Sequence, residues 1–349
     1  MSALHVVEGS YFRDVLDQPR ALRDTHARLA TSAALDAVGA RLRSGGFRRV
    51  VLTGMGSSFH GFAPLHLRLV AAGRASSMVE SSELLYYQDA LLAEGTLLVL
   101  QSQSGRSAEI VRLLDVVRGR GVATVGLTNT AGSPLAEAAD ACLFTHAGEE
   151  ATVSCKTYLA AQMALGFLGE ALVGGDTAAA LAALAPTIGA TEAYVAAWRE
   201  RVDSLADALA GVRAVYYTGR GASMAAAGSA GLITKESTHL PSEGMSGAAF
   251  RHGPMEMLDA AVFLLVFEGA ARTRALSASL VADVRAAGAR AFLAGPASDH
   301  PALRLPDLGD LARPVLELLP VEMMTLALAA LHGREAGRFE RATKVTATE

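Results

Sequence analysis

Cysteine, lysine and charged residues in general are scarce in this sequence of 349 residues. Cys142 and Cys155 are its two cysteines, and without a signal peptide they favour a reducing compartment and argue against a disulfide framework. Charged residues make up 19% of the chain and the formal net charge is −4, so the sequence offers no basic footprint for nucleic acid. The scarcity of lysine beside arginine is interpreted as a compositional bias rather than as a binding signal.

A long apolar run and a leader sequence are also missing. No uninterrupted apolar run reaches the ~18 residues that a membrane helix needs, and the opening MSALHVVEGS lacks the basic, apolar and cleavage regions of a signal peptide. Hydrophobic residues nevertheless account for 51% of the chain, which suits two well-packed domains of ordinary size. We therefore expect a globular cytoplasmic protein with no membrane partner.

The chain contains an internal repeat. Arg48–Ser58 and Val212–Ser223 both read as a strand that ends in Thr-Gly-x-Gly-x-Ser, and they lie about 165 residues apart. Two further strand pairs follow, Thr96–Leu100 with Phe263–Phe267 and Gly121–Leu127 with Gly288–Ala294, and helical patterns such as Ser107–Arg118 and Thr273–Ala287 separate them. Strands that alternate with helices form βαβ units. The pattern predicts an α/β protein with two tandem doubly wound, flavodoxin-like parallel sheets.

The repeat also sets the expected boundaries of the domains. They are an N-terminal segment at 1–34, a first domain at 35–172, a helical joint near 174–192, a second domain at 190–332 and a C-terminal tail at 333–349. Ligands of open parallel sheets bind at the carboxyl ends of the strands. The candidate chemistry should therefore lie in the segments that follow each strand.

Small hydroxyl residues crowd two such strand ends. Gly54–Ser58 follows one expected strand, and Ser102–Ser107 (sequence SQSGRS) follows another. Glycines let a backbone approach a ligand, and helix N-termini and hydroxyls supply donors, so this combination suits a phosphate. A helix cap would explain one serine but not Ser102, Ser104 and Ser107 together. Neither the P-loop nor the Gly-x-Gly-x-x-Gly dinucleotide pattern is present.

The second half of the repeat differs at the matching position. It reads EGAARTR at 268–274, without serines, so the second half should contribute something other than a phosphate cradle. Glu236 near the end of a helical pattern, Glu243, and His252 in a glycine-rich loop are plausible acid–base partners there. A glutamate at a helix end and a surface histidine also occur without any function. Cys155 is expected to be a buried thiol, and neither a metal nor an organic cofactor is implied.

The sequence resembles the tandem sugar isomerase (SIS) domain family. Its members include the isomerase half of glutamine–fructose-6-phosphate amidotransferase and stand-alone amino-sugar phosphate deaminase/isomerases. The motifs that carry the resemblance run nearly end to end: Tyr11-Phe12, Asp17-Gln18-Pro19, Gly56-Ser57-Ser58, Ser102-Gln103-Ser104-Gly105, Gly132-Ser133-Pro134-Leu135, Ala147-Gly148-Glu149-Glu150, Ser154-Cys155-Lys156, Gly219-Arg220-Gly221, Lys235-Glu236, His252-Gly253-Pro254 and Lys344-Val345-Thr346.

The resemblance implies a role for each matching residue. The residues that would hold a sugar phosphate are Ser57, Ser58, Ser102, Gln103, Ser104, Ser107 and Ser154. Glu236 would move a proton between C1 and C2 of the opened sugar, and His252 would assist ring opening from the neighbouring subunit of a homodimer. Lys344 matches a tail lysine that closes over the sugar. The family's chemistry needs no cofactor.

Some positions depart from the amidotransferase pattern. The chain opens Met1-Ser2-Ala3, without that enzyme's N-terminal cysteine nucleophile or glutamine-hydrolysing domain. Ile233 stands where the amidotransferase has a lysine lining the sugar site, and Arg106 replaces an acidic residue. The Phe250–Pro254 and Arg272–Ala275 segments are closer to the stand-alone enzymes.

Three functions follow as expectations. The leading one is a phosphosugar deaminase/isomerase that acts on an amino-sugar 6-phosphate such as glucosamine 6-phosphate. The alternatives of the same class are a fructosyl-amino acid phosphate deglycase and a plain aldose–ketose phosphate isomerase. The alternative of another class is a phosphosugar sensor without turnover. Retention of Glu236 and His252 favours an enzyme, because a sensor needs no proton shuttle.

Overall fold

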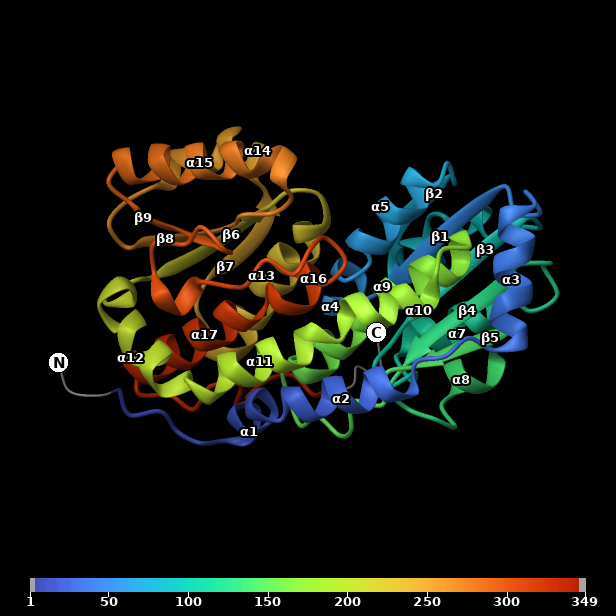
Figure 1. Ribbon diagram of the computed structural model, residues 1–349, viewed down its shortest axis with the longest axis horizontal. Coiled ribbons are helices and arrows are strands. Elements are labelled where there is room, and N and C mark those ends of the chain that lie inside the picture. The colour runs from blue at the N-terminus through green and yellow to red at the C-terminus, as the bar shows by residue number, and fades with distance from the viewer. Residues whose placement is uncertain (1–3, 345–349) are drawn as a thin grey trace.

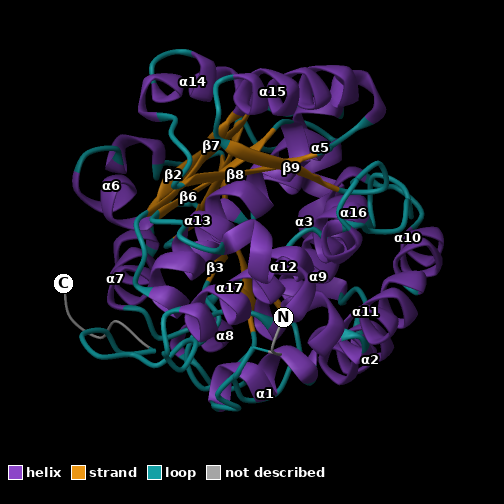
Figure 2. Cartoon of the chain, turned by 90° about the vertical axis from the view of Figure 1, so that its left-hand side faces the viewer, coloured by secondary structure: helices purple, strands orange, loops and turns teal. Residues whose placement is uncertain are grey.

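Two parallel sheets at opposite ends of the molecule, joined by buried helices, make up the fold (Figure 1). The computed structural model describes residues 4–344. Figure 2 shows the same chain turned by 90°, with helices surrounding both sheets. Such an arrangement is expected of doubly wound sheets, whose helical crossovers cover both faces.

The first sheet has five parallel strands in the order β2-β1-β3-β4-β5. These are β1 (Arg49–Gly54), β2 (Ser76–Glu80), β3 (Thr96–Gln101), β4 (Ala123–Thr128) and β5 (Ala141–Phe144). The helices between them are α4 (Ser57–His60), α5 (Ala63–Ala71), α6 (Ser81–Tyr86), α7 (Ala108–Val117) and α8 (Pro134–Ala138). The strand order reverses between β1 and β3, and ligands of open sheets bind at such a switch point.

The second sheet repeats this order with one strand fewer, β7-β6-β8-β9. Its strands are β6 (Ala214–Gly219), β7 (Ser242–Ser246), β8 (Val262–Phe267) and β9 (Arg290–Ala294). Its helices are α13 (Met224–Thr238), α14 (Gly247–Arg251) and α15 (Arg274–Ala286). The predicted repeat and fold class are therefore confirmed, with β1, β3 and β4 matched by β6, β8 and β9. The second switch point lies between β6 and β8.

The remaining helices join the two sheets. They are α1 (Ser10–Leu16), α2 (Gln18–Arg28), α3 (Ala33–Arg43), α9 (Lys156–Val173), α10 (Thr177–Leu184), α11 (Pro186–Ala196), α12 (Trp198–Leu209), α16 (Arg313–Leu316) and α17 (Leu319–Leu331). Helices α9 and α17 bury nearly all of their side chains, which explains why they are apolar on every face. One continuous core extends from β1 and β3 through these helices to β6 and β8.

Two helical stretches, Thr177–Ala196 and Arg313–Leu331, are long and apolar enough to cross a membrane by length and composition. This qualifies the expectation from the sequence, which considered only uninterrupted apolar runs. The second stretch is 89% buried within the protein, as a core helix is. The first is divided where α10 gives way to α11, at Ala185. Both are weak indications of a membrane span.

Candidate active site

The segment after β1 forms one side of the candidate site. Gly56 has a φ of +54°, a conformation that glycine adopts without strain, and it leads directly into α4. Ser57 is buried, and its hydroxyl has no hydrogen-bond partner among residues 4–344. A Cβ atom at Gly54 would lie 3.0 Å from the carbonyl oxygen of Gln101, so the two strand ends approach each other closely. Ser57 thus offers an unused donor at the switch point.

The serine loop after β3 forms the opposite side. The Ser102 hydroxyl lies 3.0 Å from that of Ser107 and accepts from the Gly105 amide at 3.1 Å, while the Ser104 hydroxyl accepts from the Arg106 amide at 3.2 Å. Ser107 precedes α7, yet its side chain makes no capping hydrogen bond. Helix capping therefore does not account for this cluster. Because its oxygen accepts from an amide, Ser104 keeps a hydroxyl hydrogen that can donate elsewhere, and so does whichever of Ser102 and Ser107 accepts in their mutual hydrogen bond.

The loop is held in place from the neighbouring strand β4. The carbonyl oxygen of Gln103 accepts from the Asn129 amide at 3.0 Å and from the Thr128 hydroxyl at 3.1 Å. A small cavity between the two loops is lined by Ser57, Ser58, Gln103, Ser154 and Thr157, among others. The Ser154 and Thr157 hydroxyls lie 3.3 Å apart. The structure thus brings Ser57, Ser58, Gln103 and Ser154 together around one small cavity, while Ser102, Ser104 and Ser107 lie in the adjoining loop before α7.

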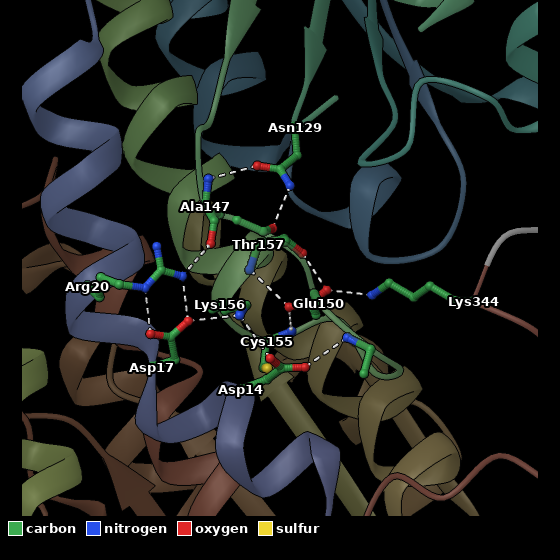
Figure 3. A network of polar contacts seen from close by, with 12 residues as sticks. Asp14, Asp17, Arg20, Asn129, Ala147, Glu150, Cys155, Lys156, Thr157 and Lys344 are labelled. Atoms are coloured by element: carbon green, nitrogen blue, oxygen red, sulfur yellow. Dashed lines mark hydrogen bonds and ion pairs between the residues drawn. The ribbon is translucent and has the colours of Figure 1, made fainter. Parts of the chain in front are cut away.

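Glu150 links this region to the C-terminal tail (Figure 3). Its side chain is fully buried; one oxygen accepts from the amides of Cys155 at 2.9 Å and Thr157 at 3.0 Å, and the other from the Thr157 hydroxyl at 2.6 Å. The second oxygen also pairs with the Lys344 ammonium. The sequence analysis quoted Glu150 within a motif but assigned it no role. Its position in the sequence, directly after Glu149 and shortly before Ser154-Cys155-Lys156, was the available indication that Glu150 belongs to the site.

Lys344 reaches the same cavity as the serine loop. A cavity of about 760 Å³ is lined by Gln103, Ser104, Glu150 and Lys344, among others. The tail, distant in sequence from the loop, therefore lies beside it in space. Val345 and Thr346, which complete the tail motif, lie outside the described residues.

Glu236 lies near the end of α13, close to the tail. It is half-buried, and its carboxylate has no hydrogen-bond partner among residues 4–344. Burial raises the pKa of Glu236 to about 7; Lys344 lowers it and the Glu150 carboxylate raises it further. A carboxyl group with such a pKa can both accept and release a proton at neutral pH. Ile233, one turn earlier, is fully buried in the core, so no polar group replaces the expected lysine.

His252 does not join this group within one chain. It directly follows α14, which packs against β7, and it is exposed. Its imidazole has no hydrogen-bond or ion-pair partner in the described part of the chain. The expected role across a subunit boundary is therefore still a prediction, as is the homodimer itself.

Lys156 and Cys155 lie at the start of α9, where they support the site. The Lys156 ammonium, almost fully buried, pairs with Asp14 at 2.9 Å and Asp17 at 2.8 Å and so fastens α1 and α2 to the start of α9 (Figure 3). Burial lowers the pKa of Lys156, but the hydrogen bonds to Asp17 and Asp14 outweigh it and raise that pKa. Cys155 is fully buried, which confirms the expected buried thiol, and burial raises the pKa of that thiol.

A known domain family and several curated proteins match this chain in sequence. Residues 47–171 match the SIS domain. The chain is 26% identical over 349 residues to the glutamine–fructose-6-phosphate aminotransferase [isomerizing] of Pyrococcus horikoshii; the match covers 97% of this chain and 57% of that protein. The chain thus spans little more than half the length of the curated relatives that it matches.

Solved structures share the fold. The C-terminal domain of glucosamine-fructose-6-phosphate aminotransferase from Francisella tularensis has a TM-score of 0.82 at 19% identity, covering 95% of this chain and 98% of that one. Glucosamine-6-phosphate deaminase from Thermotoga maritima has a TM-score of 0.76 at 19% identity, covering 94% and 96%. Residues 47–171 thus match a SIS domain, and the chain as a whole is similar in sequence to part of the glutamine–fructose-6-phosphate aminotransferases.

Proposed function

We propose that this protein is a cytoplasmic, cofactor-independent phosphosugar deaminase/isomerase that works as a homodimer on an amino-sugar 6-phosphate of the glucosamine 6-phosphate kind. One observation carries the proposal: Lys344, paired with Glu150, lines the same cavity as Gln103 and Ser104 of the serine loop. A cation that faces an anion cradle, with Glu236 within electrostatic reach, suits a substrate that carries a phosphate at one end and a carbonyl at the other.

The serines would anchor the phosphate remote from the reacting carbons. After ring opening, Glu236 would take the proton from C2 and return it to C1, which converts the 2-amino aldose into the imine of the ketose. Water would then add to the imine carbon and ammonia would leave, so that one water is consumed for each ammonia released. Lys344 would stabilise the negative charge that develops on the carbonyl oxygen during proton transfer. His252 of a second subunit would assist ring opening.

A fructosyl-amino acid phosphate deglycase is the second candidate. The cavity of about 760 Å³ leaves room for a second substituent on the sugar. Ile233 is also buried where the aminotransferase has a lysine at the sugar, so the site lacks a charged group found in the nitrogen-transferring relatives. Both reactions begin with the same proton transfer through Glu236 and differ in the leaving group.

A product assay tests the proposal. The protein is incubated with glucosamine, galactosamine and fructosyl-amino acid 6-phosphates, and ammonia, free amino acid and ketose phosphate are measured. Ammonia release that is lost in Glu236→Gln supports the deaminase, whereas release of an amino acid points to the deglycase. Tight binding without any product would contradict both enzymes and favour a sensor. Glu200→Gln is a matched control, because Glu200 is an exposed carboxylate in the first turn of α12, outside the candidate site.

A further inference from the structure

A second crevice lies at the other switch point, between the ends of β6 and β8. A cavity of about 360 Å³ is lined there by Arg220–Ser223 after β6 and by Ala270, Arg272 and Thr273 after β8. Its opposite wall comes from α5 and α9 of the first half. The internal repeat makes this crevice the counterpart of the serine cradle, although the serines are absent. Its volume is within the range of small-molecule sites.

Positive charge gathers in this crevice. Arg68 and Arg313 line it but are occupied, Arg68 with Glu170 at 2.6 Å and Arg313 with Asp310 at 2.7 Å. Arg220 and Arg272 also line it, and neither guanidinium has a hydrogen-bond or ion-pair partner among residues 4–344. These two groups therefore stay available for an anion, and guanidinium groups bind phosphates through paired hydrogen bonds.

The backbone adds to this positive field. Helix α13 begins at Met224, just after the lining segment from β6, and α15 begins at Arg274, just after the lining segment from β8. The positive ends of the two helix dipoles therefore lie next to the crevice, although the amides of Met224 and Arg274 are bonded within the preceding 3-10 turns. Glu268, the acidic residue at the end of β8, does not oppose this field, because it is buried and paired with Arg274 and the Ala297 amide.

A buried polar side chain that lines the crevice also has one atom without a hydrogen-bond partner among residues 4–344. Gln162 of α9 is 2% exposed and lines the cavity. Its amide nitrogen donates to the carbonyl oxygen of Gly61 at 3.2 Å, and its amide oxygen has no partner in the described chain. A buried acceptor without a donor is costly unless a ligand or water satisfies it. A hydroxyl group of a ligand would do so.

We propose that this crevice is a second ligand site, separate from the serine cradle, that binds a phosphate ester of a hydroxylated small molecule. Arg220 and Arg272 hold the phosphate, the two helix dipoles favour its negative charge, and Gln162 accepts from a hydroxyl. The ligand contacts both halves of the chain, so its binding stabilises their relative arrangement. Gln162 also donates a hydrogen bond to Gly61, next to the α4 turn that carries Ser57. A ligand bound in the crevice therefore influences the serine cradle through this contact. The proposal concerns binding and does not depend on which reaction the cradle supports.

Calorimetric titration of the full-length chain with fructose 6-phosphate tests this site. The Ser57→Ala/Ser104→Ala variant weakens the cradle, and Ser57→Ala breaks no hydrogen bond because that hydroxyl is unpartnered. We expect this variant to retain one binding event. Adding Arg220→Ala and Arg272→Glu should weaken that event by about tenfold or more, as loss of paired charge-assisted hydrogen bonds does. The ligand should also raise the Tm of the cradle variant but not of the combined variant.

Arg118→Ala is the matched control, since Arg118 is an exposed arginine outside the crevice that pairs with Asp115 at 3.3 Å. It should leave the titration unchanged. Absence of binding by the cradle variant, or binding that Arg220→Ala/Arg272→Glu leaves unaffected, would overturn the second site. Neither result would bear on the proposed reaction, which is read from products alone.

Discussion

Lys344 and Glu150, separated by 194 positions in the sequence, form an ion pair at the edge of the serine cradle. Glu150 is held by the start of α9 and is fully buried, so the ammonium that it binds has a defined position. Glu236 lies close enough for both charges to influence its pKa. The C-terminal tail therefore supplies the cation around which the candidate site is arranged.

Lys344→Met should impair turnover more than substrate binding. The ammonium would act on charge that develops during proton transfer, and removal of such a group lowers kcat by roughly 10²–10³-fold. Lys344 also lowers the pKa of Glu236, so its loss should move the acidic limb of the pH–rate profile to higher pH. Steady-state kinetics across pH would measure both effects. An unshifted limb with unchanged kcat would show that the tail lysine serves only to dock the tail.

The pH dependence of activity should reflect Glu236. As the base, Glu236 must be ionised, and its pKa of about 7 means that kcat/KM should rise through neutral pH rather than near the ordinary value of 4.5. The raised folded-state pKa also means that the folded protein holds this proton more tightly than the unfolded chain. The contribution of Glu236 to the free energy of unfolding therefore decreases as the pH rises from 4.5 to about 7. Denaturant titrations of wild type and Glu236→Gln should differ in that window; parallel curves would contradict the assignment.

Ser104→Ala should weaken substrate binding and leave the fold intact. Ser104 lines the cavity, and among residues 4–344 its hydroxyl is bonded only to the nearby Arg106 amide. Its removal should therefore raise KM by about tenfold, equivalent to one hydrogen bond. Ser204→Ala, which removes an exposed hydroxyl bonded to the Arg201 carbonyl, serves as control. Kinetics and circular dichroism together test this, and an unfolded Ser104→Ala protein would instead assign the serine a structural role.

Lys156→Met should destabilise the protein by about 3–5 kcal/mol, because it leaves the Asp14 carboxylate buried without its counter-ion. Adding Asp14→Asn should restore part of that loss. Thermal and urea unfolding would measure both. Loss of activity without loss of stability would show that Lys156 acts on the substrate instead of holding α1 and α2 on α9.

His252→Asn should lose ring-opening activity, and mixed dimers can show where that histidine acts. If it serves the neighbouring subunit, co-refolding of His252→Asn with Glu236→Gln chains creates dimers with one intact site, and activity should reappear although each parent is inactive. Activity assays on the mixed sample measure this. Failure to complement in dimers of verified composition would exclude a shared site.

The sheets and the position of the serine loop could be predicted from the sequence because their determinants are local. β3 is a short apolar run followed at once by Ser102–Ser107, and that order alone places the serines at a strand end. The repeat then showed that the serines are not a requirement of the fold, since β8 is followed by EGAARTR. The helix expected at 107–118 is observed at Ala108–Val117 for the same reason, its own amphipathic pattern.

Other features depend on contacts between distant parts of the chain. The partner of Lys344, the raised pKa of Glu236 and the burial of Ile233 each arise from what surrounds the residue after folding. The same is true of Arg220 and Arg272, which share one crevice only because β6 and β8 are neighbours in the sheet. The sequence by itself determined which segments are strands and helices and which strand ends carry hydroxyls. Only the tertiary structure decided which charges meet, because burial and electrostatic coupling depend on distance in space.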